Sequence, residues 1–352
     1  MKRLIAWVGA LALGGSLLAG TVSAQQSSGP SLPREELTQQ QQQRTVQQPY
    51  NNAPIWKEVR GAVQGYASIP APEAGVLIQD GGQNWRALRN GKVSVIGGWA
   101  LVVMALVVAA FYMWRGTIQL HEAPSGRMLP RFTVVERMAH WTTAITFCVL
   151  AVSGLIMAFG KTLLIPVFGF TLFSWLAIIA KNLHNFLGPL FVLSCIVTFV
   201  VFVRDNVPKL VDLKWVASFG GLFSDGHVPS EKFNAGEKVW FWGGVTVLGL
   251  VVGISGLVLN FPNFGQTRAT MQIASLVHLA GAVLFMLGAL GHIYMGTLGV
   301  AGAYGAMKTG EVDGVWAKEH HEIWYHKAKA EAAKPQSQAP AQGKPVVVGG
   351  DD

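Results

Sequence analysis

Residues 271–299 read MQIASLVHLAGAVLFMLGALGHIYMGTLG, an apolar run that contains two histidines, His278 and His292. The run is longer than the roughly 20 residues that a helix needs to cross a bilayer core. An ionisable side chain at membrane depth is costly, so it usually faces the interior of a helix bundle and has a function. The two histidines are fourteen residues apart, which on a helix is about 21 Å of rise and about 40° of rotation. We therefore expect both on one face of one membrane-spanning helix, at two depths.

The composition of the whole chain supports a membrane protein. Of its 352 residues, 51% are hydrophobic and 13% are charged, which is far from a soluble globular profile. The 41 glycines suit close packing of helices in lipid. The net charge of +8 does not indicate nucleic-acid binding, because the cations gather in loops beside apolar runs and form no basic DNA-binding face.

Four further apolar runs of spanning length lie at about residues 94–114, 139–159, 173–203 and 239–260. Together with residues 271–299 they predict five transmembrane helices, in a chain that alternates across the bilayer. The sequence therefore predicts an all-α integral membrane protein.

The distribution of Lys and Arg predicts the orientation. Cytoplasmic loops of membrane proteins carry an excess of these residues. Segments 115–138 and 204–238 and the tail from about 300 are rich in them, whereas the loops 160–172 and 261–270 hold only Lys161 and Arg268. We expect the first three segments inside and the two loops outside. Three cations before the first helix lie on the outer side in this topology and run against the rule, namely Arg86, Arg89 and Lys92.

The N-terminal residues 1–24 have a charged start, an apolar core and a small-residue cleavage site, which predicts a secretory signal peptide. An uncleaved anchor helix is the alternative, and either would export the following segment. The remaining chain is predicted to form a partly disordered periplasmic linker or tail at 25–92, an extra transmembrane helix at 93–115, a four-helix bundle at 130–328 and a disordered cytoplasmic tail at 329–352. Whether residues 25–92 order against a partner or act as a spacer is open.

Two more histidines, His140 and His184, lie inside apolar runs. In the predicted topology His140 and His292 lie near the inner surface, whereas His184 and His278 lie toward the outer surface. Imidazole nitrogen is a natural axial ligand of haem iron. The depths therefore predict an outer pair, His184 with His278, and an inner pair, His140 with His292, each binding one haem. The alternative is that these histidines are hydrogen-bonded core residues or line a proton path.

Two further patterns accompany the histidines. Ser153-Gly154 and Ser255-Gly256 lie in similar phrases, and the runs after His184 and His278 also align, which suggests the hypothesis of duplicated hairpins. Glycines near the histidines would make room for porphyrin faces or pack helices, namely Gly188, Gly281, Gly288, Gly291 and Gly296. The other histidines are predicted to be solvated surface residues, namely His121, His227, His320, His321 and His326.

Five phrases of the sequence resemble the gamma (cytochrome b) subunit of respiratory formate dehydrogenase, over about residues 130–328. They are Glu136-Arg137-Met138-Ala139-His140-Trp141-Thr142, Leu183-His184-Asn185-Phe186-Leu187-Gly188, Phe233-Asn234-Ala235-Gly236-Glu237-Lys238, Leu290-Gly291-His292-Ile293-Tyr294-Met295 and the tail from Trp316 to Tyr325. The resemblance implies a four-helix transmembrane di-haem cytochrome b bundle, to which this chain adds one N-terminal transmembrane helix. It implies the same two pairs of haem ligands, and two haem b as cofactors.

The resemblance also implies partners and a quinone site. The partners would be an iron–sulfur (beta) subunit and a molybdopterin or tungstopterin catalytic (alpha) subunit. A quinone, menaquinone or ubiquinone, would bind beside the inner haem at Asn234, Gly236 and His292. Asn can donate a hydrogen bond to a quinone carbonyl. The alternative prediction for Asn234 is a turn or helix cap. The signal, Gln-rich linker and extra helix have no counterpart in the compact family pattern.

The resulting functional prediction is electron transfer from formate, oxidised in a partner subunit, through two b haems to quinone in a bacterial inner membrane. No residue pattern in this chain indicates a formate-oxidising site, so we expect no catalytic residues in it. A hydrogenase, a thiosulfate reductase or another molybdoenzyme is the alternative donor. A non-redox membrane anchor with structural histidines is the alternative from another class.

Overall fold

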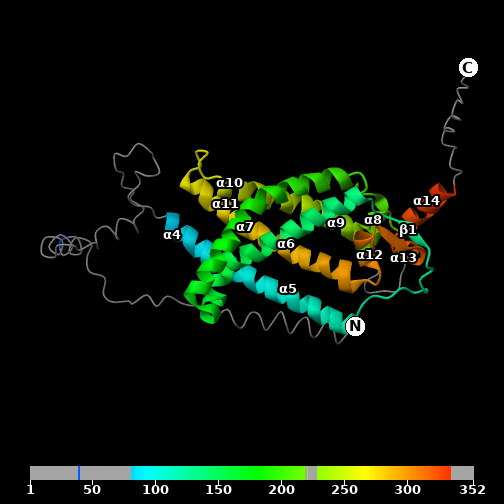
Figure 1. The fold of residues 1–352 in the computed structure, drawn as a ribbon, viewed down its shortest axis with the longest axis horizontal. Helices are drawn as coiled ribbons and strands as arrows, with labels where there is room; N and C mark the ends of the chain where they lie inside the picture. The colour runs from blue at the N-terminus through cyan, green and yellow to red at the C-terminus, as the bar shows by residue number, and fades with distance from the viewer. Residues whose placement is uncertain (1–38, 40–80, 219, 221–227, 334–352) are drawn as a thin grey trace, which may run out of the picture. The chain divides into compact units, whose positions relative to one another are not determined.

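The protein is described by a computed structural model that covers residue 39 and residues 81–218, 220 and 228–333. The predicted signal peptide at 1–24, the linker up to residue 80 apart from Gln39, and tail residues 334–352 lie outside these ranges. Within them, five helices are long and apolar enough to cross a membrane (Figure 1). The all-α fold and the multi-pass membrane character predicted from the sequence are confirmed.

The first spanning helix is built from α4 (Gly81–Arg86), the π-helical segment η1 (Ala87–Val93) and α5 (Ser94–Arg115). The predicted boundary between linker and helix at residue 92 is therefore wrong, because the helix begins at Gly81. Trp85 explains the extension: its indole Nε1 donates to the Gln272 carbonyl at 3.1 Å and to Ser275 Oγ at 2.9 Å. This anchor holds a polar helical turn that hydropathy alone does not identify.

The other four spans form a bundle. In chain order they are α6 (Val134–Leu163), α7 (Ile165–Phe202), the continuous α9 (Ala235–Val239), η3 (Trp240–Leu248) and α10 (Gly249–Asn260), and the continuous α11 (Arg268–Tyr294) and η4 (Met295–Gly299). Helix α6 packs along α7, α7 against α10, and α10 against α11, whereas α5 packs on α11. The bundle thus consists of two hairpins, α6–α7 and α10–α11. The N-terminal spanning helix packs on the α10–α11 hairpin.

Local signals explain where these helices begin. Thr133 caps α6 through a capping box, in which Thr133 Oγ1 accepts from the Glu136 N–H at 3.2 Å and the Glu136 carboxylate accepts from the Thr133 N–H at 2.7 Å. Thr267 caps α11 by accepting from the Thr270 N–H at 3.2 Å. Such caps satisfy backbone donors that a helix start leaves without partners.

The prediction of an outer loop at 160–172 is wrong, because this stretch is mostly helical. Leu164 is the one residue between α6 and α7, and Pro166 occupies the first turn of α7. Gly169 then interrupts α7 with φ of 72°, a left-handed conformation that glycine adopts without a Cβ penalty. A tight junction and a bend therefore replace the expected loop.

Short elements gather at one end of the bundle, which we call the α13 end (Figure 1). They are α8 (Leu210–Ala217), β1 (Met128–Pro130), α12 (Ala303–Lys308), β2 (Glu311–Asp313), α13 (Gly314–His320) and α14 (Glu322–Ala332). The strands β1 and β2 pair antiparallel, with Leu129 opposite Val312. The predicted tail boundary at 329 falls inside α14, which continues to Ala332.

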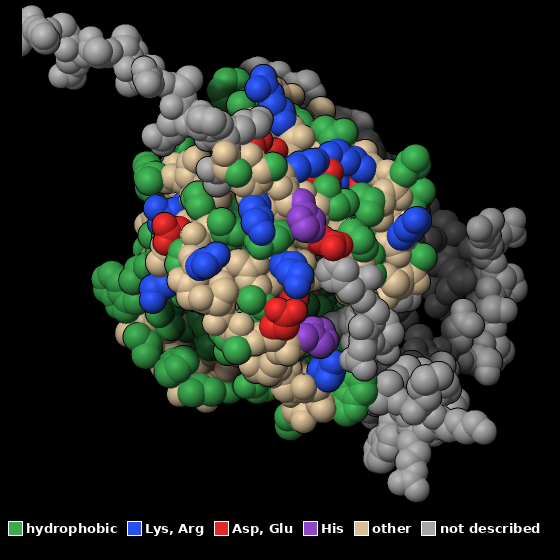
Figure 2. Space-filling model, turned by 90° about the vertical axis from the view of Figure 1, so that its right-hand side faces the viewer, with side chains coloured by type: hydrophobic (Ala, Val, Ile, Leu, Met, Phe, Trp, Pro, Cys, Tyr) green, Lys and Arg blue, Asp and Glu red, His purple; other side chains and the backbone are tan. Residues whose placement is uncertain are grey.

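The surface of the described part follows the same division. Large apolar side chains are exposed along the spanning helices, for example Phe186 at 80%, Val200 at 65% and Leu250 at 61%, as expected where helices face lipid. Figure 2 shows the α13 end, where Lys and Arg side chains lie among Asp and Glu. Inside the bundle, Phe191, Val252 and Phe285 form a buried apolar cluster.

Candidate functional site

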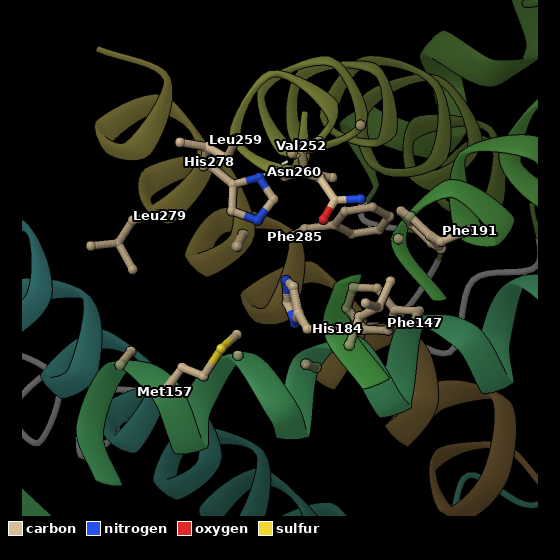
Figure 3. Close-up of a pocket in the computed structure, with 18 of the residues that line it drawn as sticks. Phe147, Met157, His184, Phe191, Val252, Leu259, Asn260, His278, Leu279 and Phe285 are labelled. Atoms are coloured by element: carbon tan, nitrogen blue, oxygen red, sulfur yellow. Dashed lines mark hydrogen bonds between the residues drawn. The ribbon is translucent and has the colours of Figure 1, made fainter. Parts of the chain in front are cut away.

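The first part of the site is the pair His184 on α7 and His278 on α11. Their imidazole rings project toward each other from opposite sides of a cavity (Figure 3), with ring centroids 6.1 Å apart. The cavity has a volume of about 330 Å³ and mostly apolar walls, which include Phe147, Val252 and Phe285. The structure thus brings together the two histidines that the predicted depths had paired.

Two glycines let the rings of this pair lie against the opposite helices. A Cβ atom on Gly154 would be 3.3 Å from His184 Cε1, and one on Gly256 would be 3.0 Å from His278 Cε1. Both glycines also line the cavity. Of the five glycines singled out in the sequence, Gly188 lines the cavity as well.

The other four of those glycines do not line the cavity. A Cβ on three of them would contact other helices or side chains, and one on the fourth would meet no atom within 4 Å among the described residues. A Cβ on Gly281 would meet Val251 and Val252, and one on Gly288 would meet Trp240. These two allow helices and a large indole to approach closely. Gly291 faces Met104 of α5, whereas the space around Gly296 is open within 4 Å among the described residues.

Two serines fix the tautomer of the first pair. Ser153 Oγ donates to the Leu150 carbonyl at 3.1 Å and lies 2.9 Å from His184 Nδ1. Because a hydroxyl has one proton to donate, it accepts from the Nδ1–H of His184. The other ring nitrogen, Nε2, then keeps its lone pair for a metal. Sequence reasoning noted Ser153 only as part of a repeat.

The second hairpin repeats this arrangement. Ser255 Oγ donates to the Val251 carbonyl at 2.6 Å and lies 3.2 Å from His278 Nδ1. The Val252 carbonyl accepts from the same Nδ1–H at 3.0 Å. Ser255 Oγ also lies 3.3 Å from the Val252 carbonyl, three residues earlier in the chain, as Ser153 Oγ lies 3.1 Å from the Leu150 carbonyl. The two Ser-Gly phrases therefore hold the two histidines in similar ways.

The second part of the site is the pair His140 on α6 and His292 on α11. Their ring centroids are 6.2 Å apart, with 59° between the planes. The ring of His292 stacks on Trp240 of η3, with centroids 5.2 Å apart and 16° between the planes. Among the described residues, none offers a hydrogen-bond partner to the buried Nδ1 of His140. This pair is therefore held by aromatic contacts where the first is held by hydroxyls.

An aromatic cluster separates the two pairs. Phe285 lies seven residues from His278 and seven from His292 on α11, and only 3% of it is exposed. Its ring centroid is 4.7 Å from that of Phe147 and 5.5 Å from that of Trp240. The space between the pairs is thus filled with packed rings.

Both histidine pairs fit haem iron. Two axial imidazoles on one metal each form a bond of about 2 Å, and with ring half-widths on the order of 1 Å their centroids lie about 6 Å apart. The observed separations of 6.1 and 6.2 Å match this spacing. At the first pair, the cavity and the two glycines against the rings also suit a flat macrocycle. That the four histidines bind iron stays a prediction.

The residues predicted for quinone lie at the start of α9. Asn234 caps this helix: its Oδ1 accepts from the Glu237 N–H at 2.9 Å, and its own N–H donates to Glu237 Oε2 at 2.8 Å. The amide Nδ2 is not part of this capping box. Gly236 is needed for packing, since a Cβ there would be 2.7 Å from Trp215. The helix that Asn234 starts carries Trp240, so this loop adjoins the His140–His292 pair.

A buried polar cluster at the α13 end was missed by the sequence reasoning. Arg131 is 6% exposed, and its Nη2 donates to the Lys232 carbonyl at 2.7 Å and to Glu237 Oε1 at 3.1 Å. His321 Nδ1 donates to the Glu231 carbonyl at 2.8 Å, and its Nε2 lies 3.9 Å from Glu237 Oε2. This cluster connects the tail with the loop before α9.

The prediction of solvated surface is wrong for two histidines. His321 is 1% exposed, and burial, with the positive charge of Arg131, lowers its pKa to about 3. His320 stacks on Trp316 at 4.8 Å, and burial likewise lowers its pKa. The side chains of His121 and His326 are 74% and 64% exposed, as expected. His227 lies outside the described residues.

Comparison with known proteins gives the same picture for the bundle. The family model described as prokaryotic cytochrome b561 matches residues 131–310. In Escherichia coli (strain K12), the cytochrome b556(Fdn) subunit of nitrate-inducible formate dehydrogenase is 30% identical over 219 residues, which cover 60% of this chain and 97% of that protein. The cytochrome b556(fdo) subunit of formate dehydrogenase from the same strain is 30% identical over 213 residues, 58% of this chain and 95% of that protein.

A more distant relative is the cytochrome b556 subunit of formate dehydrogenase from Haemophilus influenzae (strain ATCC 51907 / DSM 11121 / KW20 / Rd). It is 27% identical over 206 residues, 55% of this chain and 81% of that protein. The family model covers α6 to α12 and with them all four intramembrane histidines, whereas α4, η1 and α5 precede it. The chain therefore belongs to the prokaryotic cytochrome b561 family, with a further spanning helix in front of the family domain.

Proposed function

We propose that the chain is the membrane cytochrome b subunit of a formate dehydrogenase complex, which passes electrons from an iron–sulfur subunit to quinone. The observation that carries the proposal is the presence of two opposed histidine pairs, at two depths of one bundle, with centroids about 6 Å apart. Two b haems bound there would supply a pair of one-electron centres. The printed names of the relatives favour formate as the electron source.

The residues of the chain have separate parts in this function. His184 and His278 would hold the haem nearer the donor, and His140 and His292 the haem nearer the quinone. Ser153 and Ser255 keep Nε2 of the first pair free for iron. The packed rings around Phe285 keep water out of the space between the pairs. Formate oxidation belongs to a catalytic partner with molybdopterin or tungstopterin.

The predicted orientation gives the transfer a direction, from a periplasmic donor to a quinone near the cytoplasmic α13 end. The cations at the α13 end support this orientation. Moving an electron inward against the membrane potential costs about 2.3 kcal/mol per 100 mV. The step is feasible because formate oxidation is strongly downhill relative to quinone reduction.

The first experiment is a dithionite-reduced minus oxidised spectrum of the purified chain, with haem quantified against protein. We expect b-type bands and two haems for each chain. A chain without these bands would support the non-redox anchor, and fewer than two haems would contradict the paired ligands.

The second experiment identifies the donor. The complex is purified in mild detergent, its subunits are identified, and formate:quinone activity is compared with formate:dye activity. A partner with a hydrogenase or thiosulfate site in place of a formate site would reject formate. His292→Ala should abolish quinone reduction and leave formate:dye activity.

The quinone role of Asn234 can be separated from its capping role. Asn234→Asp keeps an oxygen that accepts from Glu237 N–H, and Asp caps helices as well as Asn. It removes the Nδ2 donor, so we expect a raised KM for quinone with unchanged haem content. An unchanged KM would leave Asn234 as a cap alone.

A further inference from the structure

The helix in front of the family domain is built into the bundle at the His184–His278 end. Trp85 donates to α11 through the Gln272 carbonyl and Ser275 Oγ. Further along, Gly97 lets α5 approach α11 so closely that a Cβ would be 2.9 Å from Val283 Cγ2. Both Ser275 and Val283 line the cavity between the histidines. The extra helix therefore lies beside the wall of that cavity.

Arg89 of this helix forms part of the cavity wall itself, together with His184 and His278. It belongs to the π-helical segment Ala87–Val93. Segments of π-helix inside longer helices are frequent at functional sites.

The surroundings of Arg89 call for an anion. Among the described residues that line the cavity, Arg89 is the only Arg or Lys, and none is Asp or Glu. Its Nη1 donates to Asn90 Oδ1 at 2.8 Å, and its guanidinium lies 5.9 Å from the centroid of the Trp85 ring. These partners are neutral, as are the polar lining groups Asn185, Asn260 and Ser275. A guanidinium beside an apolar membrane cavity is costly unless it is paired. Arg pairs best with a carboxylate, which it can bind through two parallel hydrogen bonds.

We propose that Arg89 binds a propionate carboxylate of the haem held by His184 and His278, so that the N-terminal spanning helix completes this cofactor site. The inference rests on the proposed function, since it needs that haem. It also explains why Arg89 lies on the side of the membrane that the positive-inside rule disfavours. The helix before the family domain is then a part of the redox site.

The test is potentiometric titration of the b haems in the purified full chain or complex, with haem content and spectra recorded for each variant. Arg89→Gln removes a positive charge beside one haem, which favours its oxidised form. We expect the reduction equilibrium of one haem to fall about tenfold, or about 59 mV for a one-electron couple, with the other unchanged. Arg86→Gln, an exposed change at the last residue of α4 in the same spanning helix, is the matched control and should leave both haems unchanged.

The outcomes separate this inference from the proposed function. Wild-type protein without b haem would reject the function. Wild-type protein with two haems, together with an Arg89→Gln variant whose potentials and haem content are unchanged, would overturn only the role of Arg89. Should Arg89→Gln fail to accumulate, Arg89→Lys gives the answer, because it keeps the charge and loses the paired hydrogen bonds. A smaller shift of the same haem is expected, and a Lys variant identical to wild type would overturn the proposal.

Discussion

The two histidine pairs have nearly the same spacing but different surroundings. At His184 and His278, each Nδ1–H donates to a serine hydroxyl. At His140 and His292, an indole stacks on one ring, and the Nδ1 of the other is buried without a hydrogen-bond partner among the described residues. The same ring spacing is thus produced by hydrogen bonds at the His184–His278 pair and by aromatic packing at the His140–His292 pair.

This difference has a consequence for redox chemistry. A hydrogen bond from the second ring nitrogen raises the basicity of a histidine ligand, and such bonds are one means by which a protein tunes haem. More basic ligands favour ferric iron. We expect the haem at His184 and His278 to have the lower potential of the two, so that electrons run downhill toward His140 and His292.

The largest effect should come from removing a ligand. His278→Ala should lose the haem at the first pair, and His292→Ala should lose the haem at the second. Each variant should completely lose electron transfer to quinone. Haem quantification and low-temperature difference spectra of each variant measure this. Retention of both haems in either variant would break the pairing on which the comparison depends.

The next largest effect is expected at Gly256. A Cβ there would be 3.0 Å from His278 Cε1, so Gly256→Ala must move the imidazole, at about 1–3 kcal/mol for overpacking. Haem at the first pair should be retained less well in this variant. Gly154→Ala should lower the haem content less, because a Cβ there would be 3.3 Å from His184 Cε1. Gly243→Ala is the matched control on the same spanning helix, since its surroundings are open within 4 Å among the described residues. Equal haem content in all three variants would contradict the steric argument.

The serine contacts can be tested through potentials. Ser153→Ala or Ser255→Ala removes one acceptor from Nδ1–H, a hydrogen bond worth about 0.5–1.5 kcal/mol. The potential of the first haem should rise, and the equilibrium constant for its reduction should increase several-fold. Ser194→Ala is the control, because that buried serine donates to the Phe191 carbonyl at 2.8 Å in the same i−3 pattern as Ser153. A shift as large in the control would remove the hydroxyls from the explanation.

The smallest expected effect concerns Trp240. Trp240→Phe shortens the ring that stacks on His292, and aromatic contacts are worth about 0.5–1.5 kcal/mol beyond burial. Only the haem at His140 and His292 should change its potential or its low-temperature band, with haem content preserved. A change confined to the other haem would show that the two environments are coupled through Phe285.

Hydropathy was enough to predict the five spans, because a bilayer demands long apolar runs whatever their packing. It failed at residues 81–92, where the helix depends on the contact of Trp85 with α11. The depth of each histidine followed from the topology, so the pairs could be anticipated. The burial of His321 could not, because it depends on Glu231 and Glu237, about ninety residues earlier in the chain.

The small sheet explains how a helix could be added in front of the bundle. Strand β1 precedes α6, the first helix of the family domain, and β2 follows α12, near the end of the segment that the family model matches. Because these strands pair, the entry and exit of the domain meet at one place, where the Arg131 N–H donates to the Gly310 carbonyl at 2.8 Å. A domain closed on itself in this way is modular. New sequence can be joined upstream of β1 and evolve its own contacts without altering the connections among the four helices.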